Sequence, residues 1–192
     1  MNVSPGGAAL EEFQDIDQLN PGDIAVLERQ LGRKPQGDVF LVARCPHGRP
    51  AVILTVPFQG DDRPTPPPLW LTCPYACREA ARLEGAGLMK RFQLMLEERG
   101  EALELFMREE EHVGSVNAEL ARLGGSIPPE RLRGRGIAGG RPGAVKCLHA
   151  HVAHALVRPS YVFGASVLAE IEDPWCDDRR CAVFAREAEP TP

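Results

Sequence analysis

The densest group of chemically active residues in the sequence lies between residues 147 and 154. Cys147 is followed by His149, His151 and His154, so three of the five histidines stand within six positions of one another. Thiolate and imidazole groups are the ligands that zinc prefers, and imidazole also serves as a general base near neutral pH. We therefore expect this segment to contribute to a metal site or a catalytic site.

The backbone conformation decides which of these four side chains can meet. In one continuous helix, the 100° step per residue would place Cys147, His151 and His154 on one face. His149 would then point roughly the opposite way. If the helix begins later, Cys147 and His149 lie on its lead-in and can converge instead. The spacing leaves both arrangements open.

Two further motifs carry soft ligands in segments far from residue 147. Cys45-Pro46-His47-Gly48 is a tight turn with a potential ligand at each side, as in a zinc knuckle, although only one residue separates the two ligands. Cys73-Pro74 follows a short apolar stretch, at the kind of strand end that can present a thiolate to a shared site. We expect both motifs to supply candidate ligands, and we expect Cys77, Cys181 and His112 to be bystanders.

Composition limits the classes of protein to which the chain can belong. It has 192 residues, the size of one ordinary domain, and a net charge of −5, which disfavours binding to nucleic acid or to an anionic membrane. The first fifteen residues show no secretory signal, and the apolar runs are too short to cross a bilayer. We therefore expect a cytoplasmic protein, in which the six cysteines serve metal binding, redox chemistry or simple burial.

The elements that must position these residues follow an α+β pattern. Asn20 is a predicted helix N-cap, with Pro21 at the first helical position and Asp23 three residues on, and the helix should end at Gly32. Two β-rich stretches flank the Cys45 turn and form a hairpin, and a short strand precedes Cys73. Further helical segments are predicted from about Tyr75 to Gly100, from there to Leu123, from Val145 to Leu156 and from Val162 to Ile171. We expect a small antiparallel β-hairpin-based sheet packed with four or five helices, and we divide the chain into a flexible N-terminal tail (1–19), a single globular domain (20–176) and a polar C-terminal tail (177–192).

Two charged segments lie between these ligand motifs. The predicted helices before Leu123 share an acidic face, which we interpret as solvated. Its members are Glu97, Glu98, Glu101, Glu104, Glu109, Glu110 and Glu111. The following segment, Gly124 to Gly143, is rich in glycine and arginine, and Arg141 and Lys146 could hold phosphate or another small anion at the start of the next helix.

Four short motifs together resemble an uncharacterised bacterial family, the domain of unknown function numbered 501. They are Arg44-Cys45-Pro46-His47-Gly48-Arg49-Pro50, Trp70-Leu71-Thr72-Cys73-Pro74, Leu83-Glu84-Gly85-Ala86-Gly87-Leu88-Met89 and Val145-Lys146-Cys147-Leu148-His149-Ala150-His151. The resemblance spans roughly residues 21–176. It implies that Cys45, Cys73, Cys147 and His149 belong to the characteristic pattern of the family, and His154 often fits too.

This chain departs from the family pattern at two places. Many members carry Cys-Pro-Cys-Gly where this chain has Cys45-Pro46-His47-Gly48. Exchanging Cys for His keeps a metal ligand, which favours zinc over an all-thiolate cluster. The Asn-Pro-Ile-Gly that often follows the histidine-rich helix is replaced here by residues 158–164, so no polar role is carried over to that segment.

Three functions remain open from the sequence. The first is a zinc-stabilised module, with Cys45, Cys73, Cys147 and one of His47 or His149 closing a tetrahedral site. The second is a metal-dependent hydrolase of a phosphorylated or anionic substrate, with His151 or His154 as general base and Arg141 or Lys146 holding the anion. The third is an iron–sulfur protein for redox chemistry or sensing, with Cys45, Cys73 and Cys147 as ligands and Cys176 as a candidate fourth.

Overall fold

In the computed structural model, residues 16–57, 68–98, 100–124, 127–132, 134–139 and 141–186 are described. The proposed flexible tail therefore lies almost entirely outside the described residues, as do the proline-rich segment 58–67 and the last six residues.

An antiparallel sheet forms the centre of the fold. Its four strands, in the order β1-β2-β3-β4, are Asp17–Gln18, Val39–Arg44, Pro50–Thr55 and Leu69–Leu71. The hairpin predicted around Cys45 is confirmed: β2 and β3 pair antiparallel, and the turn is closed by hydrogen bonds from Cys45 N to Arg49 O (2.9 Å) and from Gly48 N to Cys45 O (2.9 Å). The short strand expected before Cys73 is β4. The chain therefore has the predicted α+β architecture.

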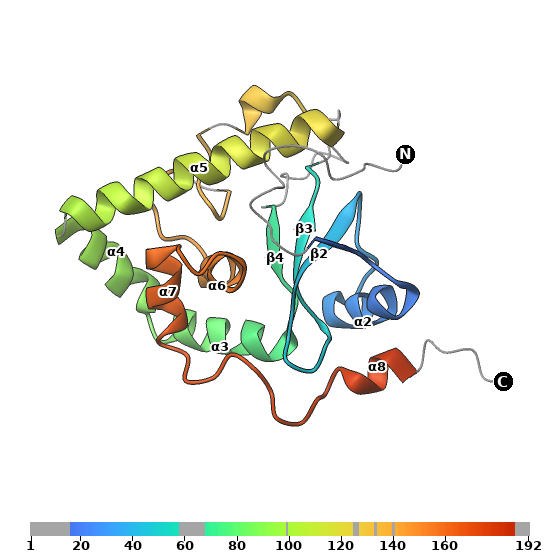
Figure 1. The fold of residues 1–192 in the computed structure, drawn as a ribbon. Coiled ribbons are helices and arrows are strands. Elements are labelled where there is room, and N and C mark those ends of the chain that lie inside the picture. Colours follow the sequence, from blue (N-terminus) through green and yellow to red (C-terminus); the bar gives the residue numbers. More distant parts are fainter. Residues whose placement is uncertain are drawn as a thin grey trace.

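Alternation along the strands gives the sheet two apolar faces. Leu41, Ile53 and Trp70 pack with Leu27 of α2 (Pro21–Leu31) on one face. Their neighbours along the strands, such as Val52 and Leu54, belong to the larger core on the other face. The histidine-rich helix α6 (Leu148–Val157) covers that second face, so the sheet lies between α2 and α6 (Figure 1).

The start of α2 follows the pattern predicted from the sequence. Asn20 accepts a hydrogen bond from Asp23 N (2.9 Å), and the Asp23 side chain in turn accepts one from Asn20 N. Gly32 ends the helix in the left-handed conformation. The buried Asp23 carboxylate also forms a two-pronged ion pair with Arg44 (2.8 and 3.0 Å), which connects α2 to the end of β2.

The helical segments are more numerous than expected, with seven α-helices in the described residues. The segment after Tyr75 divides into α3 (Pro74–Gly85) and α4 (Leu88–Glu98), because Gly87 takes a positive φ of 82° between them. The remaining helices are α5 (Gly100–Gly124), α6, α7 (Val162–Leu168) and α8 (Ala182–Arg186). A short 3₁₀ turn over Pro129–Arg131 follows α5.

The acidic helix face is only partly solvated, which departs from the interpretation of all seven glutamates as a solvated surface. Glu110 is 2% exposed and lies inside the fold. Glu109 forms an ion pair with Arg158 (3.1 Å), while the other five glutamates of this face are exposed.

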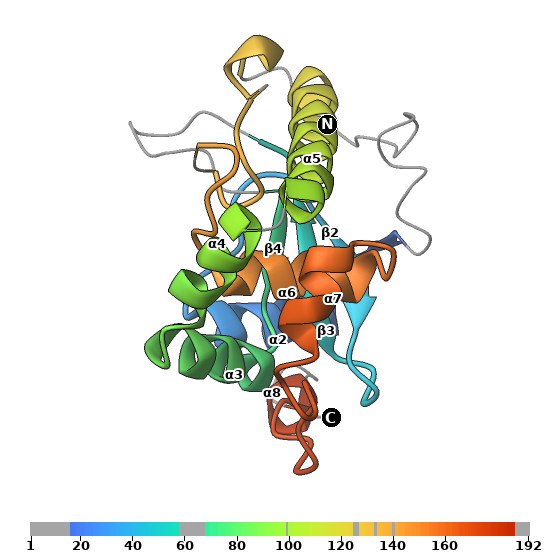
Figure 2. The same ribbon diagram turned by 90° about the vertical axis from the view of Figure 1, so that its left-hand side faces the viewer.

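The C-terminal segment returns to the body of the protein. It passes beneath α3 and ends in α8, which contacts α2 (Figures 1 and 2). Residues 177–186, which the sequence placed in a polar tail, include the buried Cys181. Among the described residues, no helix combines the length and the apolar character needed to cross a membrane.

Candidate metal centre

Glu84, Cys147 and His149 bring three potential metal ligands together. Their ligand atoms all lie within 4.8 Å of one another, and within the described residues they are the one such group of three or more. His149 Nδ1 is 3.8 Å from Cys147 Sγ and 3.1 Å from Glu84 Oε1. All three side chains are half-buried, so the group can be reached from solvent.

These separations match the edges of a small coordination polyhedron. Zinc bonds of about 2.0–2.3 Å in a tetrahedron place neighbouring ligand atoms roughly 3.2–3.8 Å apart. The distance from His149 Nδ1 to the thiol is at the upper end of this range, and its distance to the carboxylate is just below the lower end. The three atoms are therefore spaced closely enough to share one ion once the side chains adjust.

The electrostatics of the group favour a cation. Cys147 and Glu84 raise the pKa of His149 to about 9, although partial burial opposes the shift. A thiol and a carboxylate thus stabilise positive charge on the ring, as they would stabilise a metal ion beside it. Both contacts involve Nδ1, so the three residues do not form a nucleophile–histidine–acid triad, which needs both ring nitrogens.

The end of α3 and the start of α6 position these ligands. The expected helix from Val145 begins three residues later, and Cys147 is its N-cap in an extended conformation (φ −154°, ψ 114°). Cys147 lies on the lead-in, as in the second arrangement, whereas His149 lies in the first turn of the helix, and their side chains still converge. Glu84 Oε1 also accepts a hydrogen bond from Leu148 N (2.7 Å), so the carboxylate caps α6 from a neighbouring helix.

Two side chains fix the glycine-rich loop that leads to Cys147. Gln93 of α4 donates to Gly143 O (3.2 Å) and accepts from Val145 N (2.9 Å). The buried Glu110 accepts hydrogen bonds from Ile137 N (3.1 Å) and Gly143 N (2.5 Å), and burial raises its pKa, although these amides oppose the shift.

Glu110 also occupies part of the loop in which an anion site was expected. Its carboxylate already occupies the amides of Ile137 and Gly143, so an internal anion fills the role considered for phosphate in this loop. A Cβ on Gly136 would lie 2.3 Å from Glu110 Oε1, so a larger residue there would have to displace this carboxylate. Arg141 and Lys146 are both exposed, and Lys146 directly precedes Cys147.

The other three predicted metal ligands lie in a different group. Cys45, His47 and Cys73 line one small cavity together with Cys176 and Cys181. Cys73 precedes α3 and Glu84 lies near its end, so roughly 16 Å of helix rise separates the two groups. The structure thus places the five predicted ligands in two groups rather than in one.

His151 and His154, considered as general bases, face the hydrophobic core. His151 is 1% exposed, its Nδ1 pairs with the Tyr161 hydroxyl (2.8 Å), and its ring packs against Phe163. His154 is 3% exposed. Burial lowers the pKa of each to about 3, so both are neutral at physiological pH. Within the described part of the chain, neither imidazole ring forms a hydrogen bond to the Glu84–Cys147–His149 group, although the backbone N–H of His151 donates to Cys147 O (3.5 Å).

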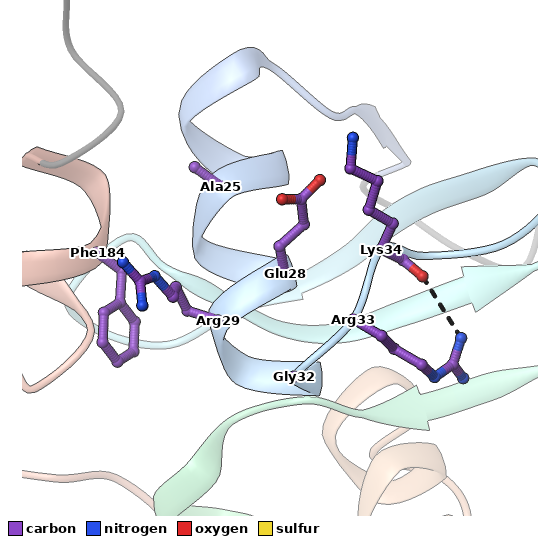
Figure 3. Close-up of a pocket in the computed structure, with 7 residues that line it drawn as sticks. All are labelled: Ala25, Glu28, Arg29, Gly32, Arg33, Lys34 and Phe184. Atoms are coloured by element: carbon purple, nitrogen blue, oxygen red, sulfur yellow. Dashed lines mark hydrogen bonds between the residues drawn. The ribbon is translucent and has the colours of Figure 1, made fainter.

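A larger hollow lies on the far side of the sheet, between the end of α2 and α8. It has a volume of about 390 Å³ and is lined by Ala25, Glu28, Arg29, Gly32, Arg33, Lys34 and Phe184. Figure 3 shows that the charged side chains do not converge on one point: Arg33 donates instead to the backbone oxygen of Lys34 (3.5 Å). This hollow therefore offers no set of ligands comparable with the half-buried group.

The fold and the site together define an α+β domain with a cysteine–histidine–carboxylate group at the junction of two helices. Residues 41–169 match the family described as a protein of unknown function, DUF501, and the chain belongs to this family. The resemblance inferred from the four motifs is confirmed. A search of curated proteins and a search of solved structures returned no match.

The sequence analysis did not identify Glu84 as a member of the half-buried group or Cys181 as a member of the cysteine group. Glu84 did stand within a family motif, Leu83-Glu84-Gly85-Ala86-Gly87, whose acidic residue was the available signal. Cys181 had no such signal, because its approach to Cys45 depends on the path of the C-terminal segment.

Proposed function

We propose that this protein binds zinc through Glu84, Cys147 and His149, with one coordination position left open to solvent. The observation that carries the proposal is the convergence of a thiol, an imidazole and a carboxylate at 3.1 and 3.8 Å around one ring nitrogen. A set of one sulfur, one nitrogen and one oxygen ligand suits zinc, whereas an iron–sulfur cluster needs several thiolates.

The proposed ion would connect two parts of the fold. Glu84 comes from the end of α3, and Cys147 and His149 come from the start of α6. Zinc binding to the folded state alone would stabilise this junction. All six cysteines are free thiols in the structure, which suits a reducing cytoplasm as the place of action.

Metal titration of three single variants tests the proposal. Cys147→Ser and His149→Ala should each lower the affinity for zinc by more than tenfold, because each removes a ligand. Glu84→Gln should lower it by about 10–100-fold while keeping an oxygen to accept from Leu148 N. Isothermal titration of the metal-free protein with zinc chloride would give the affinities.

Cys77→Ser is the matched control. The Cys77 thiol belongs to the same helix as Glu84 and donates to Leu71 O (3.3 Å), an interaction that serine can retain. Zinc affinity should be unchanged in this variant. The proposal is wrong if the Cys147→Ser and His149→Ala proteins fold normally and bind as much zinc, as tightly, as the wild type.

Hydrolysis of a phosphorylated or anionic substrate is the second candidate function. Three protein ligands leave a position where zinc could bind water and lower its pKa, and the exposed Lys146 stands beside Cys147 to attract an anion. Zinc-loaded protein should then hydrolyse para-nitrophenyl phosphate, and Cys147→Ser should remove this activity.

The burial of His151 and His154 makes the kinetic predictions for this hydrolase more specific. Because His154 is buried in the core, His154→Leu should leave the turnover number within about twofold, and Lys146→Ala should raise KM more than it lowers kcat. Turnover that is the same with and without zinc would exclude a metal-dependent hydrolase of this substrate.

A further inference from the structure

Four of the six cysteines surround one small cavity that the proposed zinc site does not use. Cys45 comes from the β2–β3 turn, Cys73 from the residue before α3, and Cys176 and Cys181 from the segment before α8. Cys73, Cys176 and Cys181 are buried, and Cys45 is half-buried. Segments more than 100 residues apart in sequence therefore bring their thiols to one place.

The size of the cavity limits what it can hold. Its volume is about 10 Å³, which is at the lower limit for one water molecule. That space suits a single ion and excludes an iron–sulfur cluster or an organic ligand. Four thiolates around one ion are the ligand set of structural zinc sites.

The polar groups around the cavity suit a negatively charged centre. Zinc with four thiolates carries a formal charge of about −2, counting +2 for the ion and −1 for each thiolate. Arg49, Arg179 and Arg180 all line the cavity. Arg49 Nε is buried without a hydrogen-bond partner among the described residues, so it is a donor that a thiolate could satisfy. Gln30 Nε2 already contacts Cys181 Sγ (3.5 Å).

The segment that carries the last two cysteines is irregular but partly buried. Residues 172–181 form turns and bends without regular secondary structure, yet Cys176 and Cys181 are buried. His47 Nε2 contacts Cys176 O (2.5 Å), so this ring nitrogen of His47 is engaged with the backbone of the segment. Arg179, beside the cavity, adopts a left-handed φ of 49°, a conformation that costs free energy and needs a compensating interaction.

We propose that Cys45, Cys73, Cys176 and Cys181 hold one structural zinc ion, which fastens the C-terminal segment to the hairpin turn and to the start of α3. The four sulfur atoms are not yet within 4.8 Å of one another, so coordination requires the thiols to rotate about χ1 toward the cavity. Each thiol gives its proton to solvent as the zinc–sulfur bonds form. The site is closed, and it serves stability rather than chemistry.

Zinc content of the full-length protein distinguishes this site from the Glu84–Cys147–His149 site. Wild-type protein purified without chelator should contain two zinc ions per chain by mass spectrometry. The Cys176→Ser/Cys181→Ser double variant should contain one, and so should Cys147→Ser, while Cys77→Ser should keep two. If the cysteine double variant contains as much zinc as the wild type, the second site does not exist. If the Cys176→Ser/Cys181→Ser variant loses zinc and Cys147→Ser does not, the result would support this site and contradict the proposed function.

Thiol reactivity tests the same proposal in wild-type protein, so it does not depend on the folding of a variant. Iodoacetamide labelling of Cys45, Cys73, Cys176 and Cys181 should be slow in the zinc-loaded protein and at least tenfold faster for all four after chelation. Cys77, half-buried and outside the cavity, should change far less. Equal labelling rates with and without chelator, iron in place of zinc, or a disulfide between any two of the four would overturn the proposal.

Discussion

Glu84 is a single residue with two structural roles. Its Oε1 atom caps the first turn of α6 through Leu148 N and also contacts His149. A sequence reading identifies cysteines and histidines easily, because few other residues bind soft metals, but a glutamate on an amphipathic helix looks like one more solvated charge. Cys147 and His149 were therefore predictable as members of the candidate site, whereas Glu84 was found only from the structure.

His154 gives a residue-scale prediction about pH. Its folded-state pKa is lowered by burial to about 3, against about 6.5 in the unfolded chain. The unfolded state therefore binds more protons between these values, and stability present above pH 6.5 is lost as the pH falls toward 3. A single group of this kind contributes up to about 1.4 kcal/mol per pH unit in that window.

Replacing His154 with leucine should reduce this acid sensitivity. His151 is shifted in the same direction, so about half of the histidine-dependent slope between pH 6 and pH 4 should disappear. At pH 7 the variant should be as stable as the wild type or slightly more stable, because the buried Nε2 of His154 has no hydrogen-bond partner in the described part of the chain. Urea unfolding at several pH values measures both effects, and an unchanged slope would contradict the burial of a neutral histidine.

At the scale of elements, the sequence predicted local structure better than contacts. The capping box of α2 and the hairpin around Cys45 depend on residues close together in the chain, so composition and spacing were sufficient. The start of α6 was predicted at Val145, three residues too early, because Glu84 from another helix caps the true start at Leu148. The same limit explains Glu110, whose burial depends on a loop more than 20 residues away.

Glu110 supports an element-scale prediction about this loop. Glu110→Ala would leave the amides of Ile137 and Gly143 without their acceptor and should lower the free energy of unfolding by about 2–4 kcal/mol. Glu110→Gln keeps one acceptor oxygen and should cost less. Urea denaturation of the two variants measures the difference.

A double-mutant cycle with Gly136 shows whether the cost arises from this contact. Gly136→Ala should be destabilising in the wild type, since the new methyl group would meet Glu110, but nearly neutral in Glu110→Ala. Fully additive effects of the two substitutions would contradict the close contact between them.

In the whole molecule, the Glu84–Cys147–His149 group and the group of four cysteines lie at opposite ends of α3. Glu84 near its end approaches Cys147, and Cys73 before its start shares a cavity with Cys45 and the C-terminal segment. The sequence predicted that these cysteines and histidines gather, but not that they gather at two places. Only the three-dimensional paths of α6 and of residues 169–186 separate the groups, and both paths depend on contacts distant in sequence.

Chelation should therefore affect the two ends of the molecule differently. Removing zinc from the closed cysteine site should release the segment from Ile171 to Arg186, whereas the start of α6 keeps its Glu84 cap. Hydrogen exchange should speed up at least tenfold in the C-terminal segment and much less in α6. Equal acceleration of hydrogen exchange in the C-terminal segment and in α6 would contradict distinct roles for the two groups.

Anomalous X-ray diffraction at the zinc edge tests most directly whether Glu84, Cys147 and His149 bind a metal ion. Crystals of zinc-loaded protein should show an anomalous peak about 2.0–2.3 Å from Glu84 Oε1, Cys147 Sγ and His149 Nδ1, with a solvent molecule as a further ligand. Zinc-loaded crystals without an anomalous peak at these three atoms would contradict metal binding by these residues.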